Sequence, residues 1–235
     1  MHRLVLWDVD GTLVRAGVAG RDVFEAAVGH VLGRALGAEV MAQVSMSGKT
    51  DPQIAAEILA LAGIAHGDVD ARVPPVLARL EVELTAAADR IRAEGVILPG
   101  VADLLPRLHR DAGVLQSVLT GNLAPNAVVK LAAFGLDRWL QLDVGAYGSD
   151  AADRRALVPI AIDKVARRYG RRFEPRETWI IGETPRDLEC ARAGGARCVL
   201  VGTGRFPADE LAGLGADAVL ADLGDVDGAV ALLAS

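Results

Sequence analysis

Short runs of apolar, often β-branched residues recur near the start of the chain and through its second half. They cover residues 4–7, 115–119, 178–181, 197–201 and 218–220. Unbroken hydrophobic runs of this kind are typical of strands in a parallel sheet that is covered on both faces. Helical periodicity fills the intervals, at residues 101–110, 126–134, 157–169, 185–193 and 208–214. The alternation predicts an α/β fold, a doubly wound (Rossmann-like) parallel sheet with right-handed crossovers.

One long stretch departs from this alternation. From residue 14 to residue 94 no strand is expected, and the pattern is helical and rich in Ala, Leu, Val and Glu. We therefore predict an all-helical cap domain at 14–95, inserted into a catalytic core made of 1–13 and 96–235. Two independent domains in series are less plausible, because the first strand would then have no sheet to join. Within the insertion, residues 68–70 and the Pro74-Pro75 pair predict a loop.

Charge and composition exclude several classes of protein. The chain has 235 residues, 25 Lys and Arg against 31 Asp and Glu, and a formal net charge of −6. This balance argues against nucleic-acid binding, which needs a basic surface to displace counterions. No apolar stretch approaches the roughly 18 residues that would cross a membrane, and no secretory signal is visible, so a cytoplasmic location is expected. Cys190 and Cys198 have no disulfide or metal spacing and are interpreted as buried apolar residues.

Two acidic residues follow the first predicted strand directly. Asp8 and Asp10 stand at i and i+2, just before Gly11-Thr12-Leu13, where open α/β sheets place their ligands. Crowded carboxylates repel one another and resist burial, and a divalent cation resolves that conflict. Oxygen ligands favour Mg²⁺ over softer metals. The simpler alternative is a capped turn in which both acids accept hydrogen bonds from backbone amides.

The Asp-x-Asp-Gly-Thr-Leu segment resembles the signature of the haloacid dehalogenase superfamily, in its phosphatase branch. The resemblance implies that Asp8 attacks phosphorus and forms an aspartyl-phosphate. It also implies that Asp10 protonates the leaving oxygen and later activates water, and that its backbone carbonyl binds Mg²⁺.

A second motif, Thr120-Gly121-Asn122, follows the predicted strand at 115–119. A hydroxyl beside a glycine at a strand end offers a side-chain donor and free backbone amides to a phosphate. By resemblance, Thr120 holds the transferring phosphoryl group, and Gly121 and Asn122 complete the phosphate site. An ordinary N-cap of the next helix is the alternative.

The family also requires a fixed cation ahead of its last acidic motif. The usual Lys-Pro pair is absent, and the segment Asp153-Arg154-Arg155 stands in its place. We assign the role to Arg154, which resemblance to family members with a similar segment supports. Arg155 is the next candidate and Lys164 a more remote one. A guanidinium would neutralise both Asp8 and the phosphate, with a bidentate geometry that lysine lacks.

The last motif is Gly182-Glu183-Thr184-Pro185-Arg186-Asp187, after the predicted strand at 178–181. The resemblance makes Glu183 and Asp187 metal ligands, together with Asp8 and Asp10. Glutamate stands where the family usually has aspartate, and its extra methylene leaves open whether Glu183 binds the metal directly or through water. Asp187 is expected to orient metal-bound water.

In the predicted cap, Ser47-Gly48-Lys49-Thr50-Asp51 resembles a cap segment of phosphoglycolate phosphatase-like relatives. The resemblance points Lys49 toward an anionic end of the substrate. The alternative is that Thr50 or Asp51 only caps the helix that begins near Pro52.

Together these motifs predict a magnesium-dependent phosphatase that acts on a small-molecule phosphomonoester, as a monomer or homodimer. Phosphoglycolate is the leading substrate by resemblance, followed by sugar phosphates and nucleoside monophosphates. A phosphosugar mutase of the β-phosphoglucomutase type and a catalytically silent binding module are the alternatives. A dinucleotide-binding enzyme is disfavoured, since no Gly-x-Gly-x-x-Gly follows the first strand.

Overall fold

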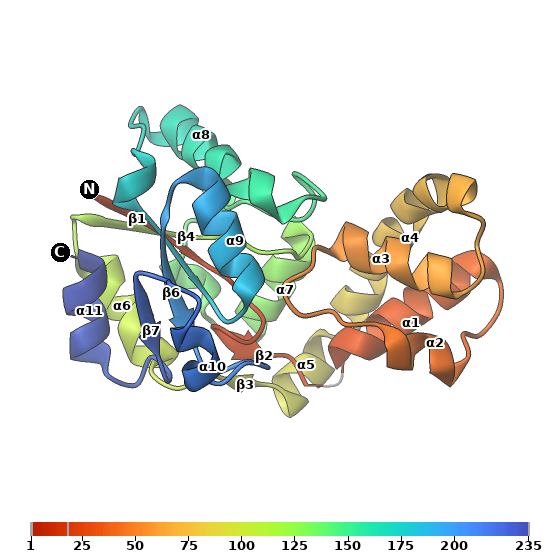
Figure 1. The fold of residues 1–235 in the computed structure, drawn as a ribbon. Coiled ribbons are helices and arrows are strands. Elements are labelled where there is room, and N and C mark those ends of the chain that lie inside the picture. Colours follow the sequence, from red (N-terminus) through yellow and green to blue (C-terminus); the bar gives the residue numbers. More distant parts are fainter. Residues whose placement is uncertain (1, 18, 235) are drawn as a thin grey trace.

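A computed structural model describes residues 2–17 and 19–234 of the chain. An α/β part built on a twisted sheet occupies one side of the molecule, and a bundle of helices occupies the other (Figure 1). Both termini lie in the α/β part, at the end far from the bundle (Figure 1).

Five parallel strands form the main sheet, in the order β4-β1-β5-β6-β7. Their bounds are β1 (Arg3–Trp7), β4 (Val114–Val118), β5 (Thr178–Gly182), β6 (Arg197–Val201) and β7 (Ala218–Leu220). The predicted doubly wound α/β fold is therefore confirmed. Because the strands are parallel, their carboxyl ends meet at one edge, and this edge faces the helical bundle (Figure 1).

Helices cover both faces of the sheet, and the alternation of side chains along β1 shows the two layers. Val5 and Trp7 pack with α6 (Val101–Arg110) and α11 (Val226–Ala234). Leu4 and Leu6 point to the opposite face and pack with three helices from the second half of the chain. Those helices are α8 (Leu157–Tyr169), α9 (Pro185–Gly194) and α10 (Ala208–Ala212). Cys190 and Cys198 are free thiols buried in this second layer.

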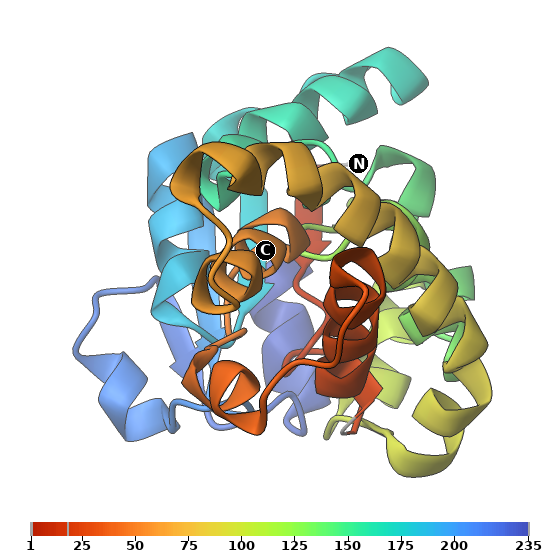
Figure 2. The same ribbon diagram turned by 90° about the vertical axis from the view of Figure 1, so that its right-hand side faces the viewer.

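The helical bundle lies between β1 and the rest of the core in the sequence, and its apolar residues form a separate hydrophobic cluster. Its helices are α1 (Ala19–Leu32), α2 (Ala38–Gln43), α3 (Asp51–Leu61), α4 (His66–Ala86) and α5 (Ala88–Glu94). Seen from the bundle side, they lie across the carboxyl edge of the sheet (Figure 2). We call this helical insertion the cap.

The predicted loop at residues 68–70 and Pro74-Pro75 is wrong, because both segments lie inside α4. The two prolines cannot donate backbone hydrogen bonds, but the helix continues because its apolar face is buried. Val76, Leu80 and Leu84 recur every four residues and are almost fully buried in the cap.

Two short strands join the cap to the core, and the expectation of no strand between residues 14 and 94 was wrong at its first residues. β2 (Val14–Arg15) pairs antiparallel with β3 (Val96–Ile97), through Val14 with Ile97 and Arg15 with Val96. A two-residue strand is too short to give a period-2 pattern, so the pattern alone could not identify it.

Within the described part of the chain, four 3₁₀ helices and one further α-helix complete the core. They are α7 (Ala124–Ala133), η1 (Asp137–Trp139), η2 (Leu142–Val144), η3 (Arg154–Ala156) and η4 (Pro175–Glu177). Among the described residues, no helix combines the length and the apolar composition needed to span a bilayer.

Candidate active site

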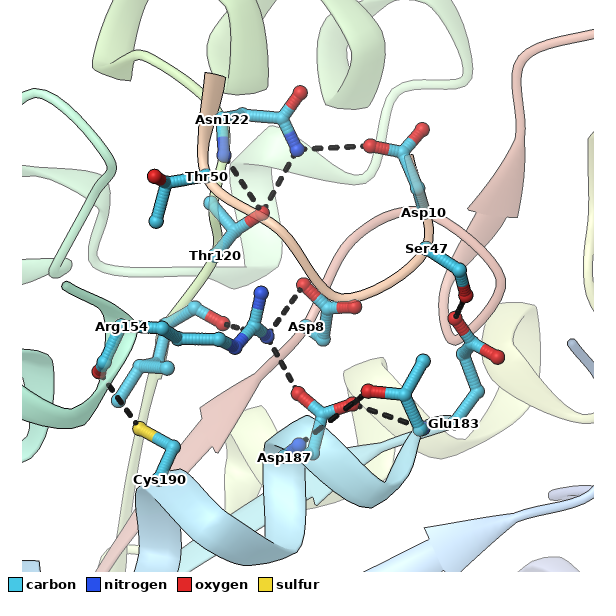
Figure 3. Close-up of polar contacts among 12 residues, drawn as sticks. Asp8, Asp10, Ser47, Thr50, Thr120, Asn122, Arg154, Glu183, Asp187 and Cys190 are labelled. Carbon is cyan, nitrogen blue, oxygen red and sulfur yellow. Dashed lines mark hydrogen bonds and ion pairs between the residues drawn. The ribbon is translucent and has the colours of Figure 1, made fainter. Parts of the chain in front are cut away.

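A cavity of about 550 Å³ lies between the carboxyl edge of the sheet and the cap. Residues after β1, β4 and β5 line it from the core, and residues of the segment between α2 and α3 line it from the cap. Figure 3 shows the side chains that converge there. The four sequence motifs, widely separated in the chain, therefore meet around one space.

Asp8 is the residue directly after β1, and its carboxylate lies at the base of this cavity, only 4 % exposed. The Arg154 guanidinium lies 3.1 Å from its Oδ1 atom. Burial raises the pKa of Asp8 to about 6, while the charge of Arg154 opposes this rise and the neighbouring Asp187 adds to it. Arg154 thus stabilises the ionised carboxylate that a nucleophile requires.

Arg154 reaches Asp8 because of the local structure of η3. The Asp153 side chain accepts a hydrogen bond from the Arg155 amide and caps this short helix. The exposed Arg155 side chain forms an ion pair with Asp153, while the buried Arg154 side chain contacts both Asp8 and Asp187. Of the candidate cations, the structure thus brings Arg154 to Asp8. Lys164 pairs instead with Asp150.

Asp187 and Glu183 have different surroundings, although they belong to one motif. Thr184 and Asp187 form a capping box at the start of α9, and Asp187 Oδ2 accepts from the Thr184 amide and hydroxyl. Asp187 Oδ1 pairs with Arg154, and the residue is fully buried. Glu183 lines the cavity and accepts hydrogen bonds from the Ser47 hydroxyl and the Arg205 amide. Both carboxylate oxygens of Asp187 are therefore used in contacts within the core, whereas the Glu183 side chain lines the cavity.

The predicted metal set was Asp8, Asp10, Glu183 and Asp187. Among the described residues, no three acidic, histidine or cysteine side chains enclose a possible cation position together. Arg154 lies between Asp8 and Asp187, and the Asp10 side chain is held by other groups.

The donor chemistry nevertheless fits a hard divalent cation beside Asp8 and Glu183. Both carboxylates line the cavity, and Glu183 has no cationic partner among the described residues. Burial, followed by repulsion from Asp8 and Asp187, raises the pKa of Glu183 to about 7. A cation between these oxygens would relieve that repulsion.

Thr120 and Asn122 form the polar wall opposite Glu183 (Figure 3). The Thr120 hydroxyl oxygen accepts from the Asn122 side-chain amide at 2.8 Å and from its backbone amide at 3.3 Å. Because both acceptor positions are used, the Thr120 hydroxyl hydrogen remains for a group in the cavity. Asn122 also donates to Asp10 Oδ2 at 2.8 Å, so this wall connects the second and first motifs.

Lys130, in α7, is a site residue that was not predicted from the sequence. Its ammonium group donates to Asp10 Oδ2 and to Asn122 Oδ1, each at 2.6 Å, and the residue is 7 % exposed. The sequence did contain a signal for a buried lysine. Lys130 stands three residues after Ala127 and one before Leu131, which are both buried. A charge on the apolar face of a helix beside a site motif predicts a buried partner.

The cap segment from Ser47 to Asp51 contacts the core closely. The Asp51 amide donates to the Gly121 carbonyl at 2.7 Å, and the Asp51 carboxylate accepts from the Leu123 amide at 2.8 Å. Thr50 donates to the Ala152 carbonyl at 2.7 Å. A Cβ atom at Gly121 would overlap the Lys49 carbonyl oxygen, so glycine is what permits this approach. The cap is therefore closed on the core in this structure.

Lys49 lines the cavity, but its ammonium group forms an ion pair with Glu57 of α3. Thr50 is the N-cap of α3 and forms a capping box with Gln53. The capping alternative for this segment is thus confirmed for Thr50, whereas the substrate contact of Lys49 stays a prediction.

The chain is similar in sequence to proteins of a known family. Residues 5–192 match the family model of haloacid dehalogenase-like hydrolases. A phosphoglycolate phosphatase of Pseudomonas putida is 26 % identical over 217 residues, which are 85 % of this chain and 69 % of that protein.

Solved structures share the fold. CbbY from Rhodobacter sphaeroides, crystallised with phosphate, matches with a TM-score of 0.67 and 21 % identity, over 96 % of each chain. A hydrolase from Pseudomonas syringae matches with a TM-score of 0.70 and 19 % identity, over 100 % of each chain.

Proposed function

Given that the chain belongs to the haloacid dehalogenase-like hydrolase family, we propose that it is a magnesium-dependent phosphatase of small phosphomonoesters. The observation that carries the proposal is the pairing of Asp8 with Arg154 at the base of a cavity closed by the cap. A buried carboxylate held beside a guanidinium suits a nucleophile that must approach a negatively charged phosphoryl group.

In the proposed reaction, a carboxylate oxygen of Asp8 attacks phosphorus and the bond from phosphorus to the ester oxygen breaks. Asp10 gives its proton to the leaving alkoxide. Asp10 then takes a proton from water, which attacks the aspartyl-phosphate, and inorganic phosphate leaves with Asp8 regenerated. Thr120 donates its free hydroxyl hydrogen to a phosphoryl oxygen, and Arg154 offsets negative charge at Asp8.

Asp8, Glu183 and the Asp10 carbonyl are the groups that we propose would hold Mg²⁺. The cation would supply positive charge for the phosphoryl oxygens and keep the crowded carboxylates ionised. Asp187 would act through Arg154 and the start of α9, because both its oxygens already have partners.

We propose a substrate with a second anionic group, of which phosphoglycolate is an example. The cavity is lined by six basic and four acidic residues, although the whole chain carries a net charge of −6. The guanidinium groups of Arg15, Arg21 and Arg205 donate only to neutral oxygens among the described residues. These oxygens belong to Thr203, to Met41 and Val44, and to Ser45. Their charges are therefore available to a carboxylate or a second phosphate. The phosphoglycolate phosphatase relative supports this choice.

The deciding experiment measures phosphate release from a panel of phosphomonoesters, with and without Mg²⁺. We expect magnesium-dependent turnover, and loss of turnover in a folded Asp8→Asn variant. An Asp8→Asn variant with most of the wild-type activity would refute the nucleophile assignment. Formation of glucose 6-phosphate from β-glucose 1-phosphate would instead support the mutase alternative. We expect a cytoplasmic monomer or homodimer, which fractionation and light scattering would test.

A further inference from the structure

The ammonium group of Lys130 lies beside Asp10 and is largely buried. α7 starts directly after the Thr120-Gly121-Asn122 segment, and Lys130 lies in its last turn. Lys130 lines the cavity, but its hydrogen-bond partners among the described residues are Asp10 and Asn122. Removing an ammonium group from water is costly, and here a carboxylate and an amide oxygen offset that cost.

These contacts define the orientation of both partners. Asn122 must turn its carbonyl oxygen to Lys130, since its amide group faces Asp10 and Thr120. Asp10 Oδ2 then accepts from both Lys130 and Asn122. Within residues 2–17 and 19–234, no donor contacts Asp10 Oδ1. One oxygen is thus fixed and the other is open to the cavity, where a leaving group or water would exchange a proton.

The Asp10 side chain needs such support because little else holds it. Its side chain is 44 % exposed, in contrast to the 6 % exposure of the Asp8 side chain. A partly exposed carboxylate has several accessible rotamers, and selecting one of them costs conformational entropy. Two donors at one oxygen select a rotamer before substrate binds.

A second acid near Lys130 belongs to the cap. Asp51 is buried, and Lys130 opposes the rise of its pKa that burial causes. The Asp51 carboxylate also accepts from Leu123 and Asn126 at the start of α7. Lys130 therefore contacts an acid of the core and is close enough to an acid of the docked cap to act on its charge.

We propose that Lys130 is a positioning residue, which acts by holding the Asp10 carboxylate in the orientation that proton transfer requires. The proposal rests on the proposed function and adds a residue to its reaction. Lys130 does not bind the substrate in this proposal. Burial of the Lys130 ammonium group costs hydration that its ion pair with Asp10 largely has to offset, so stability alone does not account for a lysine here.

The test compares Lys130→Met, which keeps the length of the side chain and removes its charge, with the wild-type protein. We expect kcat for an alkyl phosphate to fall about 10- to 100-fold, a part of what general acid–base catalysis contributes, with KM changed less than about threefold. In an Asp10→Asn background, the same substitution should change the residual kcat less than about twofold, because the group that Lys130 positions is gone. Lys164→Met is the matched control, since it removes an ammonium group paired to Asp150 outside the cavity.

A second measurement isolates the step in which the leaving group departs. The burst of nitrophenolate from p-nitrophenyl phosphate needs little acid assistance, so its rate should be nearly unchanged in Lys130→Met while alkyl ester cleavage slows. If Lys130→Met does not fold, Lys130→Gln is measured against the same criteria.

Three outcomes would overturn the proposal. They are a large rise in KM at unchanged kcat, equal losses in the wild-type and Asp10→Asn backgrounds, or equal slowing of aryl and alkyl esters. If the wild-type protein itself hydrolyses no phosphomonoester, the proposed function fails first. If the wild-type protein is active and any of the three outcomes is found, only the role of Lys130 fails.

Discussion

The hydroxyl of Ser47, in the cap, donates a 3.0 Å hydrogen bond to Oε1 of Glu183, in the core. The bond joins the lid of the cavity to an acid that we propose as a metal ligand. Because it favours the ionised carboxylate, it lowers the pKa of Glu183 against the opposing effect of burial. Closure of the cap and ionisation of this acid are therefore coupled.

Ser47→Ala should weaken the apparent affinity for Mg²⁺ by about 2- to 10-fold near neutral pH, the size of effect that the loss of one typical hydrogen bond produces. Isothermal titration calorimetry with Mg²⁺ would measure this. The difference should shrink in alkaline buffer, where Glu183 is ionised in both proteins. Ser45→Ala, which loses a contact to Arg205 instead, is the control and should leave the affinity for Mg²⁺ unchanged.

Magnesium affinity should depend on pH in a direction set by the raised pKa of Glu183, about 7, and of Asp8, about 6. A cation binds the ionised carboxylates, so protons compete with it below these values. We expect affinity to rise as the pH increases through this range and then to level off. Calorimetry in two buffers of different ionisation enthalpy should detect protons released on binding. A pH-independent affinity in the wild-type protein would contradict the assignment, and Glu183→Gln should reduce the proton release.

Gly121→Ala should prevent full closure of the cap, because the added Cβ would overlap the Lys49 carbonyl oxygen. Closing lids exclude water and complete catalytic sites, so we expect kcat/KM to fall by at least about tenfold. Steady-state kinetics and a thermal melt would separate this effect from unfolding. Gly213→Ala is the matched control, since no atom lies near its added Cβ and its backbone is helical. Wild-type kinetics in Gly121→Ala would show that this contact is not needed for closure.

Substitution of Arg205 by Gln should raise KM for phosphoglycolate more than KM for ethyl phosphate, which has no second anionic group. Loss of one charge-assisted hydrogen bond predicts a rise of about 10-fold for the substrate with two anionic groups. Arg15→Gln and Arg21→Gln should change the KM values for the two substrates in the same direction. Arg155→Gln, which alters an exposed ion pair with Asp153, should leave both constants unchanged. Equal effects on both substrates would exclude recognition of a second anion by these arginines.

The sheet could be predicted from the sequence because its strands are buried on both faces and give unbroken apolar runs. Asp8, Thr120 and Glu183 could be placed together for a related reason, since each follows a strand and parallel strands end at one edge. Lys130 belongs to no strand end. Its position depends on how α7 packs, which no local motif contains.

The sequence pattern also could not predict the hydrogen-bond and ion-pair partners of each acid. The spacing of Glu183 and Asp187 does not reveal that Thr184 occupies Asp187 Oδ2, or that Arg154 lies between Asp187 and Asp8. Pro74 and Pro75 suggested a loop because local preference opposes helix there. Burial of the apolar face of α4 outweighed that preference.

The pairing of β2 with β3 constrains how the cap can move. Both chain crossings between cap and core pass through this two-residue ribbon, so neither can bend without the other. Any opening of the cap would therefore have to displace both crossings together. Arg15 lies on the ribbon and bonds to the Thr203 carbonyl of the core at 2.8 Å. Arg15, which we propose binds the second anionic group of the substrate, therefore lies on the segment that connects the cap to the core. Binding of a charged substrate would act directly on this connection.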